Sequence, residues 1–217
     1  MSILSTQKIA EILQEYSVNQ DPNSTIVPQI QLYVSLLLQW NRSISLTTVT
    51  DPEEIVRFHF GESFFAASVV PITGGRLADV GSGPGFPGLP LKMLVPALDL
   101  TLIESNAKKA AFLSEVVRSL SLEGVHVVRE RMEQFAEKEA PGAPLVFDCI
   151  TTRAFGHFDE LLQWAKDRLT QTGSICLWLG EQDVASVSGN EEWFWKPPTR
   201  IPGTRRRFIL VGSVRTG

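Results

Sequence analysis

A glycine-rich loop constrains the fold of this 217-residue chain more than any other stretch. Residues 76–88 read RLADVGSGPGFPG, so a short apolar run, 77–80, leads directly into four glycines within eight residues. Glycine has no Cβ, and such a loop can turn sharply and bring backbone N–H groups against a ligand. A strand that enters this kind of loop just before a helix predicts the first crossover of a nucleotide-binding α/β sheet. A purely structural strand–helix turn is the alternative.

Two classes of cofactor fit the glycine spacing. Gly83, Gly85 and Gly88 match the dinucleotide fingerprint, which alone is weakly specific. Asp79, followed by Gly81, Gly83 and Gly85, matches the acidic-plus-glycine loop of enzymes that use S-adenosylmethionine (SAM). Three prolines in and just after the loop lack the N–H groups that a pyrophosphate at a helix start would require, and SAM carries no phosphate. The loop therefore favours SAM over a nicotinamide dinucleotide.

Downstream of the loop, strand-like and helix-like segments alternate. The expected strands are 76–80, 99–103, 125–128, 146–150 and 174–179, and the expected helices are 88–94, 107–120 and 159–169. Alternation of this kind predicts a mostly parallel sheet with helices on both faces and a ligand site outside the carboxyl ends of the strands. Two further strands, around 193–195 and 208–214, are separated by a linker too short for a crossover helix, so we expect them to form an antiparallel hairpin.

The first seventy residues have the pattern of helices. Apolar residues at helical spacing predict one helix around 9–16 and a second around 30–40. An aspartate followed by proline and two glutamates predicts the capped start of a third helix over 51–67. We therefore expect a helical N-terminal extension, 1–70, and an α/β domain, 71–217. The fold class is a Rossmann-like sheet that is mostly parallel with an antiparallel last strand.

Polar side chains follow several of the predicted strands. Glu104 ends the second strand, where a carboxylate can accept hydrogen bonds from both ribose hydroxyls of an adenosine; capping the helix that begins near Asn106 is the alternative. Beyond the third strand, Met132 can lie against an adenine face or pack a helix. Arg153, at the end of the fourth strand, can bind a carboxylate or phosphate by two parallel bonds, or pair with Asp79 or Glu104.

Charge is distributed unevenly along the chain. Residues 196–217 contain six basic residues and no acidic one, whereas residues 1–195 carry fourteen basic and twenty-four acidic residues. A basic tail on an acidic body predicts a polyanion at one edge, with solubilising charge on an exposed strand as the alternative. We expect a cytoplasmic protein with no membrane span, because no long apolar run or signal-peptide core is present.

Other catalytic signatures are missing from the sequence. The three histidines are scattered, and the two cysteines lie in apolar runs without metal-binding spacing, which predicts buried, reduced thiols. There is no nucleophile elbow and no Walker loop. We therefore assign no catalytic side chain, and we expect the chemistry to come from the cofactor and from positioning.

Five segments taken together resemble one family. They are residues 40–41 with 46–47, 59–63, 79–88, 131–133 and 153–155. This set resembles the bacterial small-subunit ribosomal RNA guanine-N7 methyltransferases, known as RsmG or GidB, over about residues 36–155. The resemblance implies a SAM-dependent enzyme that acts on a guanine in the conserved loop near the decoding centre of 16S rRNA in the small ribosomal subunit. Nothing in the sequence requires more than a monomer.

The resemblance and the residue patterns together define the candidate site. The candidate cofactor-binding residues are Asp79, Gly81, Gly83, Gly85, Phe86, Glu104, Ser105, Met132, Glu133 and Arg153. Of these, the resemblance implies SAM contacts at Gly81, Phe86, Met132, Glu133 and Arg153, with Glu104 at the ribose position. The candidate RNA-binding residues are Arg205, Arg206 and Arg207, which we expect to contact phosphates.

The chain departs from the family pattern at several positions that bear on RNA contact. Ser45 replaces an asparagine, Glu62 an aspartate, Leu179 a lysine, and the pair Arg206–Arg207 replaces Arg-His. The alternatives to this 16S rRNA methyltransferase are a SAM-dependent methyltransferase that acts on a small molecule or another RNA, a nicotinamide oxidoreductase and a non-catalytic RNA-binding module. Guanine N7 has a free lone pair, so a site without an evident base suits the first of these functions.

Overall fold

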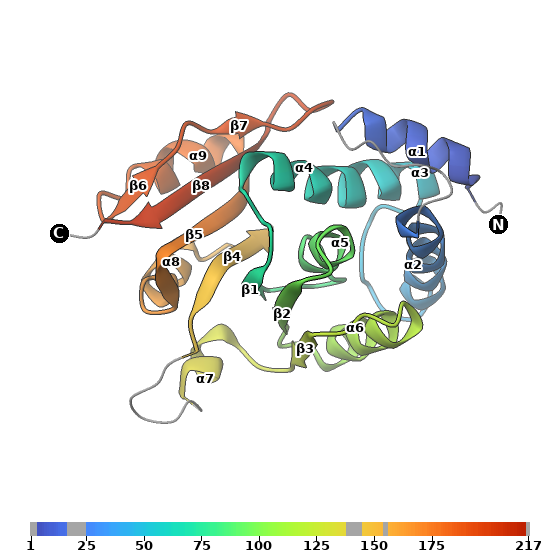
Figure 1. Cartoon of the computed structure of the whole chain (residues 1–217), viewed down its shortest axis with the longest axis horizontal. Helices are drawn as coiled ribbons and strands as arrows, with labels where there is room; N and C mark the ends of the chain where they lie inside the picture. Colours follow the sequence, from blue (N-terminus) through green and yellow to red (C-terminus); the bar gives the residue numbers. More distant parts are fainter. Residues whose placement is uncertain (1–3, 17–24, 138–144, 154–155, 216–217) are drawn as a thin grey trace.

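A computed structural model describes residues 4–16, 25–137, 145–153 and 156–215. An eight-stranded sheet runs through the molecule in the order β3-β2-β1-β4-β5-β8-β6, and β7 pairs with β8 off this path (Figure 1). The strands are β1 (Gly75–Val80), β2 (Leu98–Ile103), β3 (Val125–Val128), β4 (Phe147–Arg153), β5 (Leu169–Gly180), β6 (Trp193–Trp195), β7 (Thr199–Arg200) and β8 (Arg207–Val214). The first five strands are parallel, which confirms the predicted sheet.

The antiparallel end of the sheet is also confirmed. β8 lies between β5 and β6 and runs antiparallel to both, so the two last predicted strands do pair as expected. The linker between them contains the two-residue strand β7, which the sequence pattern did not predict. The helices α7 (Met132–Glu137) and α9 (Glu181–Ser188) were likewise not predicted.

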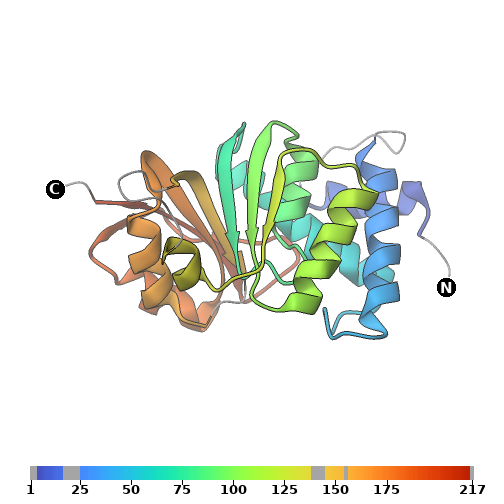
Figure 2. The ribbon, with the colours of Figure 1, turned by 90° about the horizontal axis from the view of Figure 1, so that it is seen from below.

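Helices cover both faces of the sheet (Figures 1 and 2). The helices other than α7 and α9 are α1 (Thr6–Gln14), α2 (Ile26–Asn41), α3 (Pro52–Ile55), the π-helix η1 (Val56–Gly61), α4 (Glu62–Val69), α5 (Gly88–Leu94), α6 (Ala107–Ser119) and α8 (Phe158–Lys166). Side chains of α1 to α6 belong to one core cluster, and those of α7 to α9 belong to a second. Along β5, Cys176 and Trp178 enter the first cluster while Ile175 and Leu177 enter the second, as the two-residue period of a strand requires.

The helix predicted over 51–67 is interrupted by a π-helix. Asp51 caps its start as expected, because Asp51 Oδ1 accepts a hydrogen bond of 3.0 Å from the N–H of Glu54. The hydrogen bonding then widens over Val56–Gly61 before α4 continues in α-helical form. A Cβ on Gly61 would overlap the ring of Tyr16, so α1 packs closely against this wider turn. π-Helical turns of this kind are frequent at functional sites.

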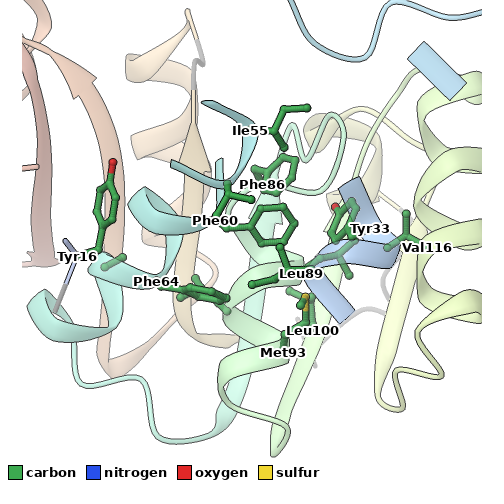
Figure 3. Close-up of a cluster of buried hydrophobic side chains, with 14 of the residues drawn as sticks. Tyr16, Tyr33, Ile55, Phe60, Phe64, Phe86, Leu89, Met93, Leu100 and Val116 are labelled. Carbon is green, nitrogen blue, oxygen red and sulfur yellow. The ribbon is translucent and has the colours of Figure 1, made fainter. Parts of the chain in front are cut away.

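The N-terminal helices share a core with the glycine loop. Figure 3 shows Tyr33 from α2 and Phe60 from the π-helix next to Phe86 of the loop. The rings of Tyr33 and Phe86 stack with centroids 5.2 Å apart, and Tyr33 Oη donates a hydrogen bond of 2.5 Å to the carbonyl of Pro84. The helices therefore hold the loop in place. The division of the chain at residue 70 stays a prediction.

The remaining expectations concern the two cysteines and membrane-spanning helices. Cys149 and Cys176 are buried and free, as predicted from the apolar runs around them. Within the described part of the chain, no helix combines the length and the apolar character needed to span a bilayer.

Candidate functional site

The glycine loop leaves the carboxyl end of β1 and is fixed to the end of β2. The N–H groups of Gly81 and Ser82 donate hydrogen bonds of 2.9 and 3.1 Å to the carbonyl of Ile103. Gly85 has a φ of +97°, and a Cβ there would lie 2.6 Å from Leu89 Cδ1 and overlap the hydroxyl of Tyr33. Gly85 is thus required by close packing of the loop against the helices on this face of the sheet.

Asp79 lies beneath the loop and is fully buried. Asp79 Oδ2 accepts a hydrogen bond of 3.2 Å from the N–H of Gly88, and Oδ1 accepts one of 2.9 Å from Thr151 Oγ1. Burial raises the pKa of Asp79 to about 7, against the opposing effect of these hydrogen bonds. The carboxyl group therefore joins β1, β4 and the start of α5, and in this structure it has no exposed surface for a ligand.

Glu104 connects the loop to the start of α6. Glu104 Oε2 accepts a hydrogen bond of 2.8 Å from the N–H of Gly83, and Oε1 accepts one of 2.7 Å from the N–H of Asn106. The side chain of Asn106 then caps α6. The capping alternative for Glu104 is thus realised in part. A carboxylate oxygen has a second lone pair, so the same group can still accept hydrogen bonds from a ribose.

Two pockets meet at Gly81. The first, of about 260 Å³ and called here the Glu104 pocket, is lined by Val80, Gly81, Ile103, Glu104, Ser105, Glu130, Arg131, Met132, Glu133 and His157. The second, of about 270 Å³ and called the Phe86 pocket, is lined by Leu46, Thr47, His59, Gly81, Ser82, Gly83, Pro84, Phe86, Lys109 and Arg153. They lie at the carboxyl ends of the central parallel strands, where the sheet topology predicts a ligand site.

Eight of the ten predicted cofactor residues line these pockets. The Glu104 pocket contains Gly81, Glu104, Ser105, Met132 and Glu133, and the Phe86 pocket contains Gly81, Gly83, Phe86 and Arg153. Asp79 and Gly85 are not among the described residues that line either pocket. The arrangement fits an adenosyl group in the Glu104 pocket, because it offers a carboxylate beside a buried, apolar Met132.

His59 is a site residue that the sequence pattern missed. It comes from the π-helix, its ring stacks on Phe86 with centroids 4.7 Å apart, and its Nε2 lies 2.9 Å from Thr47 Oγ1. Burial lowers the pKa of His59 to about 3, and the nearby guanidinium groups of Arg153 and Arg207 contribute to this shift. The imidazole is therefore neutral at pH 7. The only signal for it in the sequence was its place in one of the family segments.

Asn41 holds the loop that carries Thr47. Asn41 Oδ1 accepts hydrogen bonds of 2.8 and 3.1 Å from the N–H groups of Leu46 and Thr47, and Nδ2 donates one of 2.9 Å to the carbonyl of Thr47. This clamp gives a physical reason for the pairing of residues 40–41 with 46–47 in the family segments. It positions Thr47 against His59.

Arg153 is held by the π-helix segment rather than by the glycine loop. Arg153 Nη1 donates a hydrogen bond of 2.8 Å to the carbonyl of Phe58, and Nη2 lies 3.2 Å from Glu62 Oε2. The alternative in which Arg153 pairs with Asp79 or Glu104 is therefore wrong. Burial raises the pKa of Glu62, and the guanidinium groups of Arg153 and Arg207 oppose this shift. Ala154 and Phe155, which complete this family segment, lie outside the described residues.

The three predicted RNA-binding arginines lie on the β7–β8 loop and the start of β8. Arg205 and Arg206 are exposed, and Arg206 Nε lies 3.9 Å from Glu181 Oε2. Arg207 instead reaches inward, with Nη1 at 2.7 Å from Glu62 Oε1 and its guanidinium 4.9 Å from the centroid of the Phe58 ring. Glu62 and Arg207 are two of the departures from the family pattern, and they contact each other.

Solved structures of methyltransferases have the same fold. A putative O-methyltransferase from Klebsiella pneumoniae aligns with a TM-score of 0.66 over 98% of this chain and 99% of that one, at 14% sequence identity. A SAM-dependent methyltransferase from Aquifex aeolicus aligns with a TM-score of 0.57 over 76% of this chain and 94% of that one, at 17% identity. At such low identity the likeness shows the fold alone, and it confirms the predicted Rossmann-like class.

Sequence relatives identify the family. A protein of Desulfitobacterium hafniense (strain Y51) named ribosomal RNA small subunit methyltransferase G is 36% identical over 181 residues, 83% of this chain and 74% of that protein. The protein of the same name from Xylella fastidiosa (strain 9a5c) is 36% identical over 97% of both chains. The family model for GidB, described as rRNA small subunit methyltransferase G, matches residues 26–196. The chain is therefore a SAM-dependent methyltransferase and belongs to the GidB family.

Proposed function

We propose that the protein transfers the methyl group of SAM to N7 of a guanine in the decoding-region loop of 16S rRNA. The family and the names of its relatives support rRNA of the small subunit as the substrate. The observation that carries the proposal is the pair of pockets that meet at Gly81: one suits an adenosyl group, and the described residues that line the other include no carboxylate. Guanine N7 and the decoding-region loop follow from the resemblance stated above.

The Glu104 pocket would hold the adenosyl part of the cofactor. Glu104 would accept hydrogen bonds from ribose hydroxyls, and Met132 would lie against the adenine face. SAM supplies a methyl group on a positively charged sulfur, which is already activated for transfer. Arg153 in the Phe86 pocket would orient a carboxylate of the cofactor or the incoming base, because its guanidinium is fixed by Phe58 and Glu62.

The Phe86 pocket suits an acceptor atom that carries no proton. Its titratable lining residues among those described are His59, Lys109 and Arg153, and His59 is hydrogen-bonded to Thr47 and stacked on Phe86. Guanine N7 has a free lone pair on the major-groove edge, so no base needs to remove a proton before attack. The task of the residues is then to hold two atoms near contact, which can contribute about 7–11 kcal/mol in favourable cases. A hydroxyl acceptor would instead need a general base.

The exposed arginines would contact RNA phosphates. Arg205 and Arg206 project from the β7–β8 loop, whereas Arg207 is held in part by Glu62. The target base would have to be splayed out or single-stranded to enter the Phe86 pocket. Residues of one chain line both pockets, so the proposed site needs no second subunit, and we infer a monomer. An rRNA substrate supports a cytoplasmic location.

The test combines labelled SAM with small subunits or 16S rRNA from a strain that lacks the enzyme. Methyl label should appear at one guanine of the decoding-region loop, located by chemical cleavage at N7-methylguanine. Tight SAM binding without labelled RNA would overturn the RNA substrate, and label at another atom or loop would overturn the assigned position. The double variant Arg205→Ala/Arg206→Ala should raise the KM for RNA and lower its salt dependence, whereas Arg76→Ala, exposed at the start of β1, should change neither.

A further inference from the structure

A third pocket lies beside the site, between the end of α2 and the start of α6. It has a volume of about 510 Å³ and is lined by Gln39, Trp40, Ser43, Ile44, Ala107, Lys108 and Ala111. The two helices run side by side at this position (Figures 1 and 2). We call it the Trp40 pocket. Its described lining residues include none of the candidate SAM-binding or RNA-binding residues.

The lining of the Trp40 pocket is suited to a flat, partly polar group. Trp40 is half-buried, and its ring packs at 61° against buried Phe112 with centroids 5.7 Å apart, so the indole is supported by the core. Ala107 and Ala111 are one helical turn apart on α6 and line the same pocket as Trp40, and their small side chains leave space in it. Gln39, Ser43 and Lys108 provide hydrogen-bonding groups around this apolar surface.

The Trp40 pocket and the Phe86 pocket are built from the same two segments. On the segment after α2, Ser43 and Ile44 line the Trp40 pocket, and Leu46 and Thr47 line the Phe86 pocket. On α6, Lys108 lines the former and Lys109 the latter. A ligand that extends out of the Phe86 pocket across the first turn of α6 would therefore reach the Trp40 pocket.

The charge around this pocket matches a polyanion. Residues 31–50 and 105–114 contain three basic residues, Arg42, Lys108 and Lys109, and no acidic residue, although the chain has a net charge of −4. The first turn of α6 has no acidic side chain, and both lysines add to the positive end of its dipole. Lys108 lines the Trp40 pocket, Lys109 lines the adjoining Phe86 pocket, and Arg42 precedes the lining residue Ser43, so positive charge and the aromatic platform lie next to the proposed methylation site.

We propose that the Trp40 pocket is a second nucleobase subsite for single-stranded RNA. A base that neighbours the target guanine stacks on Trp40, and Lys108 and Lys109 contact the phosphates between the two bases. Stacking of splayed bases on aromatic side chains, combined with basic contacts to the backbone, is the usual way in which proteins hold single-stranded RNA. This inference rests on the proposed function, because it requires an RNA substrate.

The test fills the pocket without removing core contacts. Ala111→Phe adds a ring to the lining of the Trp40 pocket, and Ala185→Phe, at an exposed position of α9, is the matched control. Lys108→Glu reverses the charge at the rim, with Arg76→Glu, exposed at the start of β1, as its control. The measured quantities are the KM for 16S rRNA, the KM for SAM, the salt dependence of RNA binding and the thermal midpoint.

Ala111→Phe should raise the KM for RNA about tenfold, the size expected for one lost stacked base, with the KM for SAM and the thermal midpoint unchanged. Lys108→Glu should raise it by a similar factor and lower the salt slope by about one. If either variant matches its control, or if Ala111→Phe raises the KM for SAM as much as that for RNA, the subsite is overturned while the proposed function stands. If the wild-type protein neither binds nor methylates rRNA, the proposed function fails and the subsite fails with it.

Discussion

The substitution Glu62→Gln tests the charge network that fixes Arg153. The side chain of Glu62 is 1% exposed, and its two oxygens face Arg153 at 3.2 Å and Arg207 at 2.7 Å. Glutamine keeps the shape and one acceptor oxygen but removes the negative charge. Two guanidinium groups would then face a neutral amide, and the one on Arg153 would stay largely buried.

The expected loss in the free energy of unfolding follows from the exposure of the two arginine side chains. Breaking a buried ion pair by removing one partner costs about 3–5 kcal/mol, because the remaining charge is left without compensation. Arg153 is 18% exposed and falls in this class, whereas Arg207 is 39% exposed and can hydrate, so its contact contributes about 0–1 kcal/mol. The amide oxygen retains part of the hydrogen bonding, so we expect a loss of about 3 kcal/mol, at the lower end of that range. For a chain of this size that corresponds to a fall in Tm of about 6–12 °C.

Urea unfolding and thermal melting measure this loss directly. Glu53→Gln is the matched control: it lies in the same helical segment and pairs with Lys8 at 3.5 Å, but both side chains are at least 40% exposed. It should cost less than about 1 kcal/mol. A double-mutant cycle of Glu62→Gln with Arg153→Met isolates the pairwise energy. A Glu62→Gln protein as stable as the Glu53→Gln protein would refute the argument that the buried charge is needed to hold Arg153.

Three further predictions concern the loop and its supports. Gly85→Ala should destabilise the protein by more than about 3 kcal/mol in urea unfolding, because its Cβ meets Leu89 and Tyr33, whereas Gly203→Ala, at a φ of +71° with open space around it, should cost only the backbone strain of about 1–2 kcal/mol. Asn41→Ala should lower kcat/KM about tenfold by releasing the Thr47 loop, and Asn41→Asp, which keeps the acceptor of two of the three hydrogen bonds, should lose less. Burial raises the pKa of Asp79 to about 7 from 3.8, so the folded protein keeps a proton that the unfolded chain releases. The free energy of unfolding should therefore fall as pH rises from about 4 to about 7, by up to roughly 4 kcal/mol, and Asp79→Asn should remove this part of the curve; equal slopes for both proteins would contradict the assignment.

The part of the site that the sequence predicted depends on local rules. Strands that alternate with helices place their carboxyl ends at one edge, so the order of elements alone assigns Glu104, Met132 and Arg153 to one region. The glycine spacing located the loop between them. These arguments need only the order of elements and the chemistry of each side chain. They do not require knowledge of which residues meet across the fold.

What the sequence did not predict depends on contacts between distant segments. The partner of Arg153 is Glu62, which lies on a different element far earlier in the chain, so a pattern search near either residue cannot find it. The π-helix arises where Gly61 meets Tyr16, and the same apolar spacing is compatible with an uninterrupted α-helix. His59 looked like an isolated histidine because its neighbours, Thr47 and Phe86, come from loops whose positions are set by packing.

The π-helix explains why a helical segment outside the sheet contributes to the candidate site. Over a short stretch, this segment presents the Phe58 carbonyl and the Glu62 carboxylate to Arg153, and the His59 ring to Phe86. Gly61, the last residue of the π-helix, packs against Tyr16, which follows α1, and only glycine at position 61 allows this contact. A π-turn contains one more residue than an α-turn. Replacing the π-turn by an α-turn would therefore rotate the residues before the turn relative to the residues after it. Phe58 and Glu62 could not then both keep their present contacts with Arg153, so the packing of α1 and the geometry of the Phe86 pocket depend on the same turn.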